Sequence, residues 1–314
     1  MESKSLCKKE FFDIVDKSKS GNEILLAIRQ FVPKRLYKFY SIPEDNDKRN
    51  SRFTQLENEQ IWFSKKEFLN DPFEFEHLSL THASPEAISY YNEVLSEIEL
   101  VCLTASPFSK LMWSHYADAY KGFCVEFTVP DPVFILPVIY NDSIVNLSAS
   151  YQRLFESREK LHPTQWPYKK SEVSKDIVKL NYPLLSKDIC WQYEHEFRIL
   201  TNMPADPCKG HLHFAPNYGL HISKIIVGRN CKSEYANELY EVVDRVNSKR
   251  FANFKSTLTH ENCNEHFDVC AMKLWKYTNI WNRPVSIKTL SWDNELNLVE
   301  KSFSEDNANG QAEI

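Results

Sequence analysis

The chain has 314 residues, a net charge of −5 and only six glycines. No combination of these glycines builds a GxGxxG or GxxxxGK[ST] motif, which excludes the Rossmann fingerprint and the P-loop. The acidic balance, with a sequence pI near 6.1, gives no global electrostatic reason to expect duplex nucleic acid as an obligatory partner.

The cysteines and the hydropathy indicate the compartment. None of the eight cysteines forms a CxxC pair, and the opening stretch MESKSLCKKE carries no apolar signal segment. No apolar run approaches the roughly 18 residues that a membrane span needs. We therefore expect a cytoplasmic protein with reduced thiols and no membrane partner.

The first third of the chain predicts helices followed by short strands. Apolar spacing over 8–32 predicts two short helices with a break at 20–22, and the alternating stretch 35–41 predicts a strand. A polar loop at 43–50 precedes a helix or turn at 52–59 and a strand at 61–64. In the loop that follows, Asn70 and Asp71 stand before Pro72, which favours a rigid turn able to line a pocket.

The middle and end of the chain predict alternating helices and strands. Helices are expected at 85–99, where Ser84 is the N-cap, at 111–117, over most of 146–181 with a break at 162–167, and at 233–246. Strands are expected at 101–104, 122–127, 137–140, 211–214, 222–228 and 269–277. The pattern predicts an α+β fold with a mixed or antiparallel split sheet flanked by helices. The predicted regions are a helical lead-in at 1–33, a main α+β domain at 34–285 and a C-terminal extension at 286–314 with an acidic frayed tail.

The stretch 187–200, KDICWQYEHEFRIL, carries the densest charge pattern. Its second half alternates, and as an extended strand it places Glu194, Glu196 and Arg198 on one face. The two carboxylates would lie about 7 Å apart at their Cα atoms, with Arg198 reducing their repulsion. This arrangement suits a site that addresses one bound molecule. The alternative is a strand with one solvated face.

Two further features carry site hypotheses. Cys208, His211 and His213 are potential zinc ligands, although no fourth ligand is apparent and a plain strand with polar flanks is the simpler interpretation. His115 and Glu126 are site candidates in the helix at 111–117 and the strand at 122–127. A lone histidine beside aromatic residues is more often structural.

Five stretches resemble, in order, a bacterial family of unknown function. They are LYKFYS at 36–41, IWFSKKEFLNDPFE at 61–74, LMWSHYADAYKGFCVEF at 111–127, KDICWQYEHEFRIL at 187–200 and ISKIIVG at 222–228. On these stretches the chain is identified as a member of domain-of-unknown-function family 2971. The family name implies no activity.

The order of these stretches also resembles the ADP-ribosyltransferase fold. In that superfamily an early strand carries a His or Arg after a Tyr, a second strand reads YFS or FxS, and a late strand presents a catalytic Glu, often as ExE. By this resemblance Glu196 is the catalytic carboxylate and Glu194 the assisting acid, with Arg198 beside them. The residues expected to bind NAD are Tyr37, Lys38, Phe63, Ser64, Asn70, Asp71 and His115.

One position departs from the superfamily pattern. Lys38 replaces the His or Arg that follows the Tyr of the first strand. Lysine can donate to a ribose or phosphate oxygen, but it lacks the planar fork of arginine and the neutral acceptor of histidine.

The resemblance implies a function. Cleavage of the bond between nicotinamide and ribose in NAD builds positive charge on the sugar, and a carboxylate beside the ribose stabilises that charge. We expect an NAD-consuming ADP-ribosyltransferase-like enzyme, a toxin or antiphage effector, with an intracellular protein or nucleic acid as acceptor and a neutralising partner.

Two alternatives remain from the sequence. Glu194, Glu196, Asp71 and Glu126 could hold the divalent metal of a nuclease or phosphodiesterase. The chain could also be a non-catalytic module that binds a ligand or partner, in which the ExE face only maintains the fold.

Overall fold

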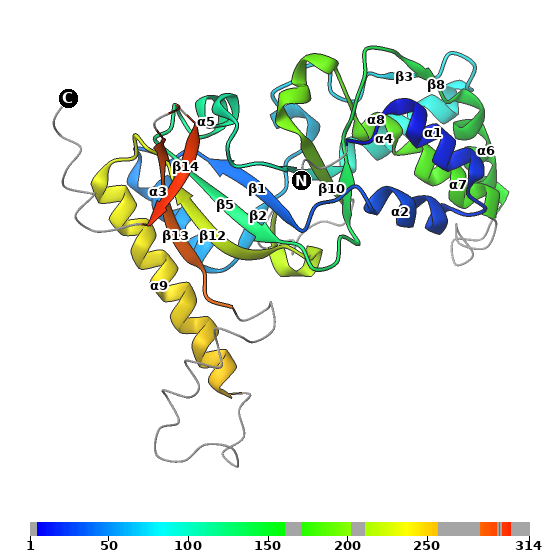
Figure 1. Ribbon diagram of the computed structural model, residues 1–314. Coiled ribbons are helices and arrows are strands. Elements are labelled where there is room, and N and C mark those ends of the chain that lie inside the picture. The colour runs from blue at the N-terminus through cyan, green and yellow to red at the C-terminus, as the bar shows by residue number, and fades with distance from the viewer. Residues whose placement is uncertain are drawn as a thin grey trace. The chain divides into compact units, whose positions relative to one another are not determined.

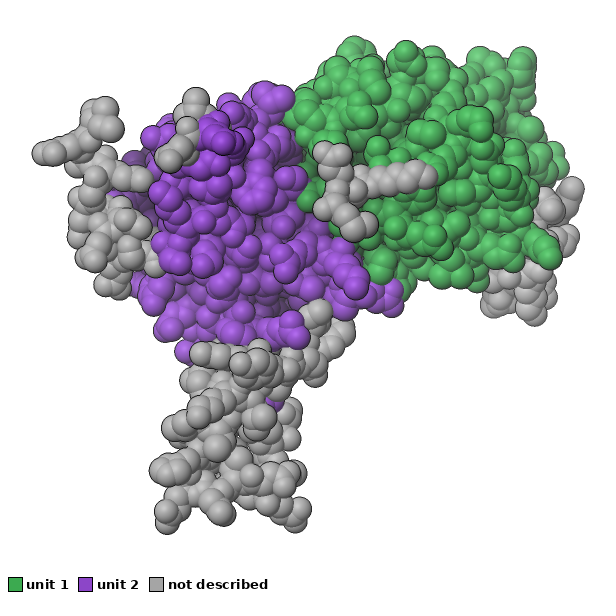
Figure 2. Space-filling model, viewed as in Figure 1, with its two compact units in different colours: residues 1–33, 62–105, 132–212 green, residues 34–61, 106–131, 213–314 purple. Residues whose placement is uncertain are grey.

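The computed structural model describes residues 5–160, 171–201, 211–256, 283–293, 295 and 297–302. The chain divides into two compact units, each built from three separate segments (Figure 2). Unit 1 comprises Met1–Pro33, Trp62–Ala105 and Pro132–Leu212, and unit 2 comprises Lys34–Ile61, Ser106–Asp131 and His213–Ile314. The predicted division at residues 33 and 285 is therefore replaced by one in which the chain alternates between two units.

Unit 1 is mostly helical around a small sheet (Figure 1). Its elements are α1 (Lys8–Lys17), α2 (Gly21–Arg29), η1 (Lys66–Phe68), β3 (Leu78–Ser79), α4 (Pro85–Glu97), β4 (Glu99–Thr104), β6 (Ile135–Pro137), β7 (Ile139–Tyr140), β8 (Val145–Asn146), α6 (Ser148–Lys160), α7 (Ser171–Leu180), α8 (Tyr182–Leu185), β9 (Ser186–Lys187), η3 (Ile189–Glu194) and β10 (Glu196–Thr201). Strand β10 pairs antiparallel with β4 on one side and with β6 on the other. Two parallel pairs, β3 with β8 and β7 with β9, complete the strands.

The N-terminal helices belong to the core of unit 1. Phe11 and Val15 of α1 and Ile24 and Ile28 of α2 are buried in one apolar cluster with residues of α6 and α7, including Tyr151. The two predicted helices are thus confirmed. Their assignment to a separate lead-in is wrong, because their apolar faces are covered by helices that come more than a hundred residues later in the chain.

Unit 2 contains five neighbouring strands of a mixed sheet, with helices packed on them (Figure 1). Its elements are β1 (Arg35–Tyr40), α3 (Asn46–Glu57), α5 (Lys110–Tyr116), β5 (Phe123–Thr128), η4 (Ala215–Tyr218), β12 (His221–Val227), α9 (Ser233–Ser256), β13 (Ser286–Trp292) and β14 (Leu298–Ser302). The order is β14-β13-β12-β5-β1, in which β12 and β13 are parallel and the other pairs antiparallel. The short strands β2 (Gln60–Trp62) and β11 (Leu212–Phe214) lie where the chain passes between units.

The structure confirms the expected mixed α+β architecture, a mixed sheet flanked by helices. It corrects two details. Residues 46–50, predicted as loop, begin α3 because the Asp45 side chain caps the helix at Lys48 N–H. Residues 286–292 and 298–302, predicted as an extension, are β13 and β14 of the unit 2 sheet. The strand predicted at 269–277 lies outside the described residues.

Within the described part of the chain, no helix is long and apolar enough to cross a membrane.

Candidate functional site

The stretch expected to form one strand contains a turn. Residues 189–194 form the 3₁₀ helix η3, which ends at His195 in the left-handed conformation (φ 43°, ψ 54°), and β10 begins only at Glu196. Glu194 therefore reaches the site from a helical turn and not from the strand. The prediction of an uninterrupted strand over this stretch is wrong. The three charged side chains that it grouped, Glu194, Glu196 and Arg198, nevertheless converge.

Arg198 links two carboxylates. Its Nε donates to Glu196 Oε1 at 2.7 Å and its Nη2 donates to Glu74 Oε1 at 2.7 Å. The remaining Nη1 donates to the carbonyl oxygen of Leu184 at 2.7 Å. All three nitrogens of the guanidinium are thus used. This is the fixed fork geometry that arginine offers and lysine does not.

Lys187 connects the third carboxylate. Its Nζ lies 2.6 Å from Glu194 Oε2, 3.1 Å from Glu196 Oε2 and 3.4 Å from Glu74 Oε1. The ammonium also lies 4.8 Å from the centre of the Trp191 ring, within range of a cation–π contact. We call Glu74, Lys187, Glu194, Glu196 and Arg198 the charge cluster.

The charge cluster lies inside unit 1. Its five side chains are between 0% and 6% exposed. Strand β10 is covered on both faces, so the expectation of a solvated face is wrong. The backbone supports the cluster as well: Glu196 N–H donates to the Tyr140 hydroxyl at 2.7 Å, and Thr104 Oγ1 donates to the Glu194 carbonyl at 2.6 Å.

The cations and anions of the cluster hold each other charged. Burial would raise the pKa of Glu196, but Arg198 and Lys187 outweigh it and hold that pKa well below its usual range. Burial would lower the pKa of Lys187, but Glu196, Glu194 and Glu74 hold it above its usual value. Glu196 is therefore a carboxylate that already shares its charge with two buried cations. Such a group is a weak proton acceptor.

The remaining predicted residues of unit 1 lie outside the cluster. Phe63 is buried in the core with 0% exposure, and Ser64 exchanges backbone hydrogen bonds with Leu100. Asn70 is exposed. Asp71 is buried and caps the predicted turn, with Oδ1 accepting from Phe73 N–H at 3.0 Å. The turn prediction is confirmed. Phe63 presents no surface on which nicotinamide could stack in this structure.

The other predicted residues belong to unit 2. The hydroxyl of Tyr37 donates to Glu126 Oε2 at 3.0 Å, and Lys224 Nζ lies 3.2 Å from the same carboxylate oxygen. Lys38 lies over the Tyr40 ring at 5.8 Å, and His115 is exposed on α5. Glu126 thus serves the strand pairing of unit 2.

The zinc hypothesis gains no support from the described residues. His211 pairs with the Glu99 carboxylate, and His213 Nδ1 lies 2.9 Å from the Tyr218 hydroxyl. Cys208 lies outside the described residues. Within the described residues, no three side chains of His, Cys, Asp or Glu are grouped as a metal site would need. Metal binding through Glu194 and Glu196 would also have to displace Lys187.

Sequence reasoning missed Glu74 and Lys187. Both stand in stretches that carry the family resemblance, and Glu74 lies between Phe73 and Phe75. The available signal was a charged residue next to an aromatic residue that packs into the core, Phe75, because buried charge requires a partner. The partner itself could not be found, since Glu74 and Arg198 are 124 positions apart.

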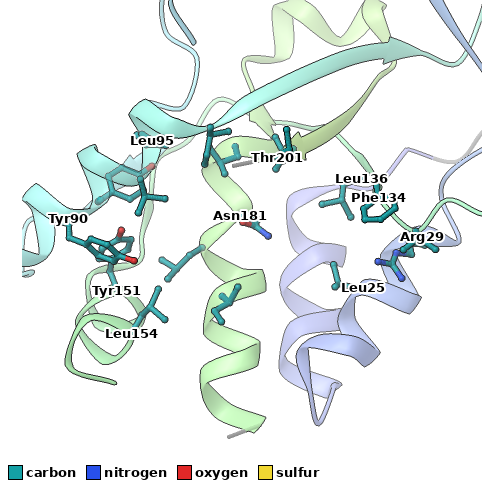
Figure 3. A pocket seen from close by; sticks show the side chains of 18 residues that line it. Leu25, Arg29, Tyr90, Leu95, Phe134, Leu136, Tyr151, Leu154, Asn181 and Thr201 are labelled. Atoms are coloured by element: carbon teal, nitrogen blue, oxygen red, sulfur yellow. The ribbon is translucent and has the colours of Figure 1, made fainter. Parts of the chain in front are cut away.

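A separate cavity of about 510 Å³ lies among the helices of unit 1 (Figure 3). Helices α2, α4, α6 and α7 and strands β6 and β10 contribute its walls. Leu25 of α2, Leu95 of α4, Leu136 of β6 and Leu154 of α6 supply apolar surface, and Tyr90 and Tyr151 supply aromatic surface.

The cavity has a few polar groups. Arg29 at the last turn of α2 and Asn181 just after α7 line it. The Nε of Arg29 is buried and meets no acceptor among the described residues, and the same holds for the hydroxyl of Tyr91. Burial raises the pKa of Tyr91, so this phenol stays a neutral donor.

The cavity adjoins the charge cluster through two residues. Leu184, whose carbonyl binds Arg198, and Leu200, two positions beyond Arg198 on β10, both line the cavity. The buried ions thus hold part of the cavity wall in place.

Comparison with known proteins identifies one family. Neither the curated proteins nor the solved structures contain a match to this chain. Residues 112–199, which include η3, His195 and the start of β10, match the model of the family described as Protein of unknown function (DUF2971). The resemblance drawn from the sequence stretches is confirmed over residues 112–199, the part of the chain that matches this family model.

Proposed function

We propose that unit 1 is a ligand-binding module that holds a small apolar molecule in the cavity between its helices. The observation that carries this proposal is the cavity itself. Its volume of about 510 Å³ and its aliphatic and aromatic walls, interrupted by a few polar groups, match the usual properties of small-molecule sites.

The charge cluster supports this assignment by the role that it plays. Each of its three carboxylates accepts a contact from Lys187, and two of them also bind Arg198. Carboxylates used in this way maintain the position of β10 and α8. This is the ligand-binding alternative in which the ExE residues maintain the fold.

Replacing Leu25 by tryptophan tests the cavity. Leu25 lines the cavity from α2, so an indole at this position fills space that a ligand needs, whereas its neighbour Leu26 is 62% exposed on the same helix. We expect wild-type protein and Leu26→Trp to bind 1-octanol in isothermal titration calorimetry, and Leu25→Trp to lose binding by about ten-fold or more.

Circular dichroism spectra and thermal midpoints of the two variants control for folding. Equal binding of 1-octanol by Leu25→Trp and Leu26→Trp, with both proteins folded, would show that the cavity is not the binding site.

A second candidate is an NAD-consuming ADP-ribosyltransferase-like enzyme, a toxin or antiphage effector that modifies an intracellular protein or nucleic acid. The observation that favours it is the convergence of Glu194, Glu196 and Arg198. In this candidate, substrate binding would have to open the cluster and free Glu196 to stabilise positive charge on the ribose.

The two candidates differ in a direct assay. The enzyme candidate requires nicotinamide release from NAD by the purified protein, with or without a cell lysate as acceptor source, and loss of that release in Glu196→Gln. Folded wild-type protein that releases no nicotinamide under either condition would remove this candidate and leave the binding module unaffected.

A further inference from the structure

We infer that the ligand of the unit 1 cavity is a monocarboxylic acid with an apolar body, and that Arg29 binds its carboxylate. This inference rests on the proposed binding function and names the chemical class of the ligand. Three observations on the described residues carry it: the donor of Arg29 that has no partner among them, the lack of an anion among those that line the cavity, and the apolar character of the remaining surface.

The first observation is the state of the Arg29 side chain. Its Nε is buried in the cavity wall and meets no acceptor among the described residues. A buried donor without a partner costs about 1–3 kcal/mol, and more when the group is charged. A guanidinium has only donors and no acceptor, so it cannot satisfy itself. An acceptor that enters the cavity removes the cost.

The second observation is the charge of the cavity wall. Arg29 is the one charged side chain among the described residues that line the cavity, and no Asp or Glu is among them. The contrast with the charge cluster is direct, since there every cation faces carboxylates of the same chain. A bound anion would supply the missing counter-charge. A carboxylate matches the planar fork of a guanidinium and accepts charge-assisted hydrogen bonds.

The third observation limits the rest of the ligand. Figure 3 shows Arg29 on one side of the cavity and Tyr90 and Tyr151 on the other, with Asn181 and Thr201 between them. The space away from Arg29 is walled mainly by leucine, isoleucine, valine and aromatic side chains. A second carboxylate would find no second cation there, and an amine would be repelled by Arg29. The wall therefore selects one acidic group on an apolar body.

The experiment compares three probes of equal chain length in isothermal titration calorimetry: octanoate, 1-octanol and octylamine. Naphthalen-1-ylacetate adds an aromatic body with the same acidic group. The proteins are the full chain in its wild-type form and the variants Arg29→Gln and Lys17→Gln. Lys17 is the matched control, because it is a cation in the last turn of α1, and Arg29 is a cation in the last turn of α2. Lys17 is exposed and does not line the cavity.

We expect wild-type protein to bind octanoate or naphthalen-1-ylacetate more tightly than 1-octanol, and octylamine most weakly. Arg29→Gln should weaken binding of the acids by about ten- to hundred-fold, as expected for loss of a hydrogen bond to a charged group. Binding of 1-octanol should change by less than about three-fold, and Lys17→Gln should bind every probe as wild type does. The acid that binds more tightly then identifies the ligand body as aliphatic or aromatic.

Two results overturn the inference in different ways. If 1-octanol binds as tightly as both acids and Arg29→Gln has no effect, the cavity binds ligands but not through Arg29, so the carboxylate class is wrong. If none of the four probes binds folded wild-type protein, the proposed binding function itself fails, together with the inference.

Discussion

Replacement of Arg198 by methionine lowers the free energy of unfolding by about 3–5 kcal/mol, the cost expected when one member of a buried ion cluster is removed. Methionine keeps much of the apolar stem but removes every donor. Glu196 and Glu74 then keep only Lys187 as a cation, and the carbonyl of Leu184 loses its partner. The stability falls because the buried carboxylates lose a cation at a place where water cannot solvate them.

The measurement is the urea midpoint of the full chain, followed by circular dichroism. Arg245→Met is the matched control: Arg245 also pairs with two carboxylates, Glu57 and Glu241, but its side chain is 49% exposed. Exposed pairs contribute at most about 1 kcal/mol, so this variant should stay close to wild type. Similar midpoints for Arg198→Met and Arg245→Met would show that water reaches the charge cluster.

Acid destabilises the wild-type protein through Glu196. The folded-state pKa of this carboxyl is held well below 4.5, its ordinary value, so the unfolded state binds the proton first as the pH falls. The stabilisation is complete above pH 4.5 and is lost as the pH decreases toward the lowered folded-state value. Lys187 and Arg198, whose pKa values are raised, remain charged throughout this window and add no slope to it.

The test compares the pH dependence of the unfolding free energy in wild type and in Glu196→Gln. We expect the variant to be less stable at neutral pH and to lose less stability below pH 4.5, because the group that titrates is absent. Glu57→Gln serves as control: the pKa of Glu57 is also lowered, by Lys249 and Arg245, but its side chain is 20% exposed, so solvent screens the effect. If the unfolding free energies of wild type and Glu196→Gln fall equally steeply with decreasing pH, Glu196 is not the group responsible for the acid destabilisation.

Local signals in the sequence predicted individual elements well. The Ser84-Pro85 pair predicted the start of α4, where the Ser84 side chain accepts from Ala87 N–H. The alternation of Phe123, Val125 and Phe127 predicted β5. Both predictions succeeded because they depend on residues within one or two turns of each other. The family resemblance also rested on such short stretches, and residues 112–199 confirm it.

Predictions that depended on distant partners failed. Strand β13 was assigned to an extension, because the strand with which it pairs in parallel, β12, lies some sixty residues earlier. The left-handed turn at His195 was also missed, because the alternation of charges continued through it.

The site shows the same division. The mixed α+β class, most helices and strands, the family resemblance and the grouping of Glu194, Glu196 and Arg198 could be predicted from the sequence, because these features follow from local spacing and short motifs. The fold was needed to show that this group is buried, that Glu74 and Lys187 complete it, and that Arg29 lines an apolar cavity. Burial and ion pairing arise from segments far apart in the chain that fold against each other, and no local pattern specifies those contacts.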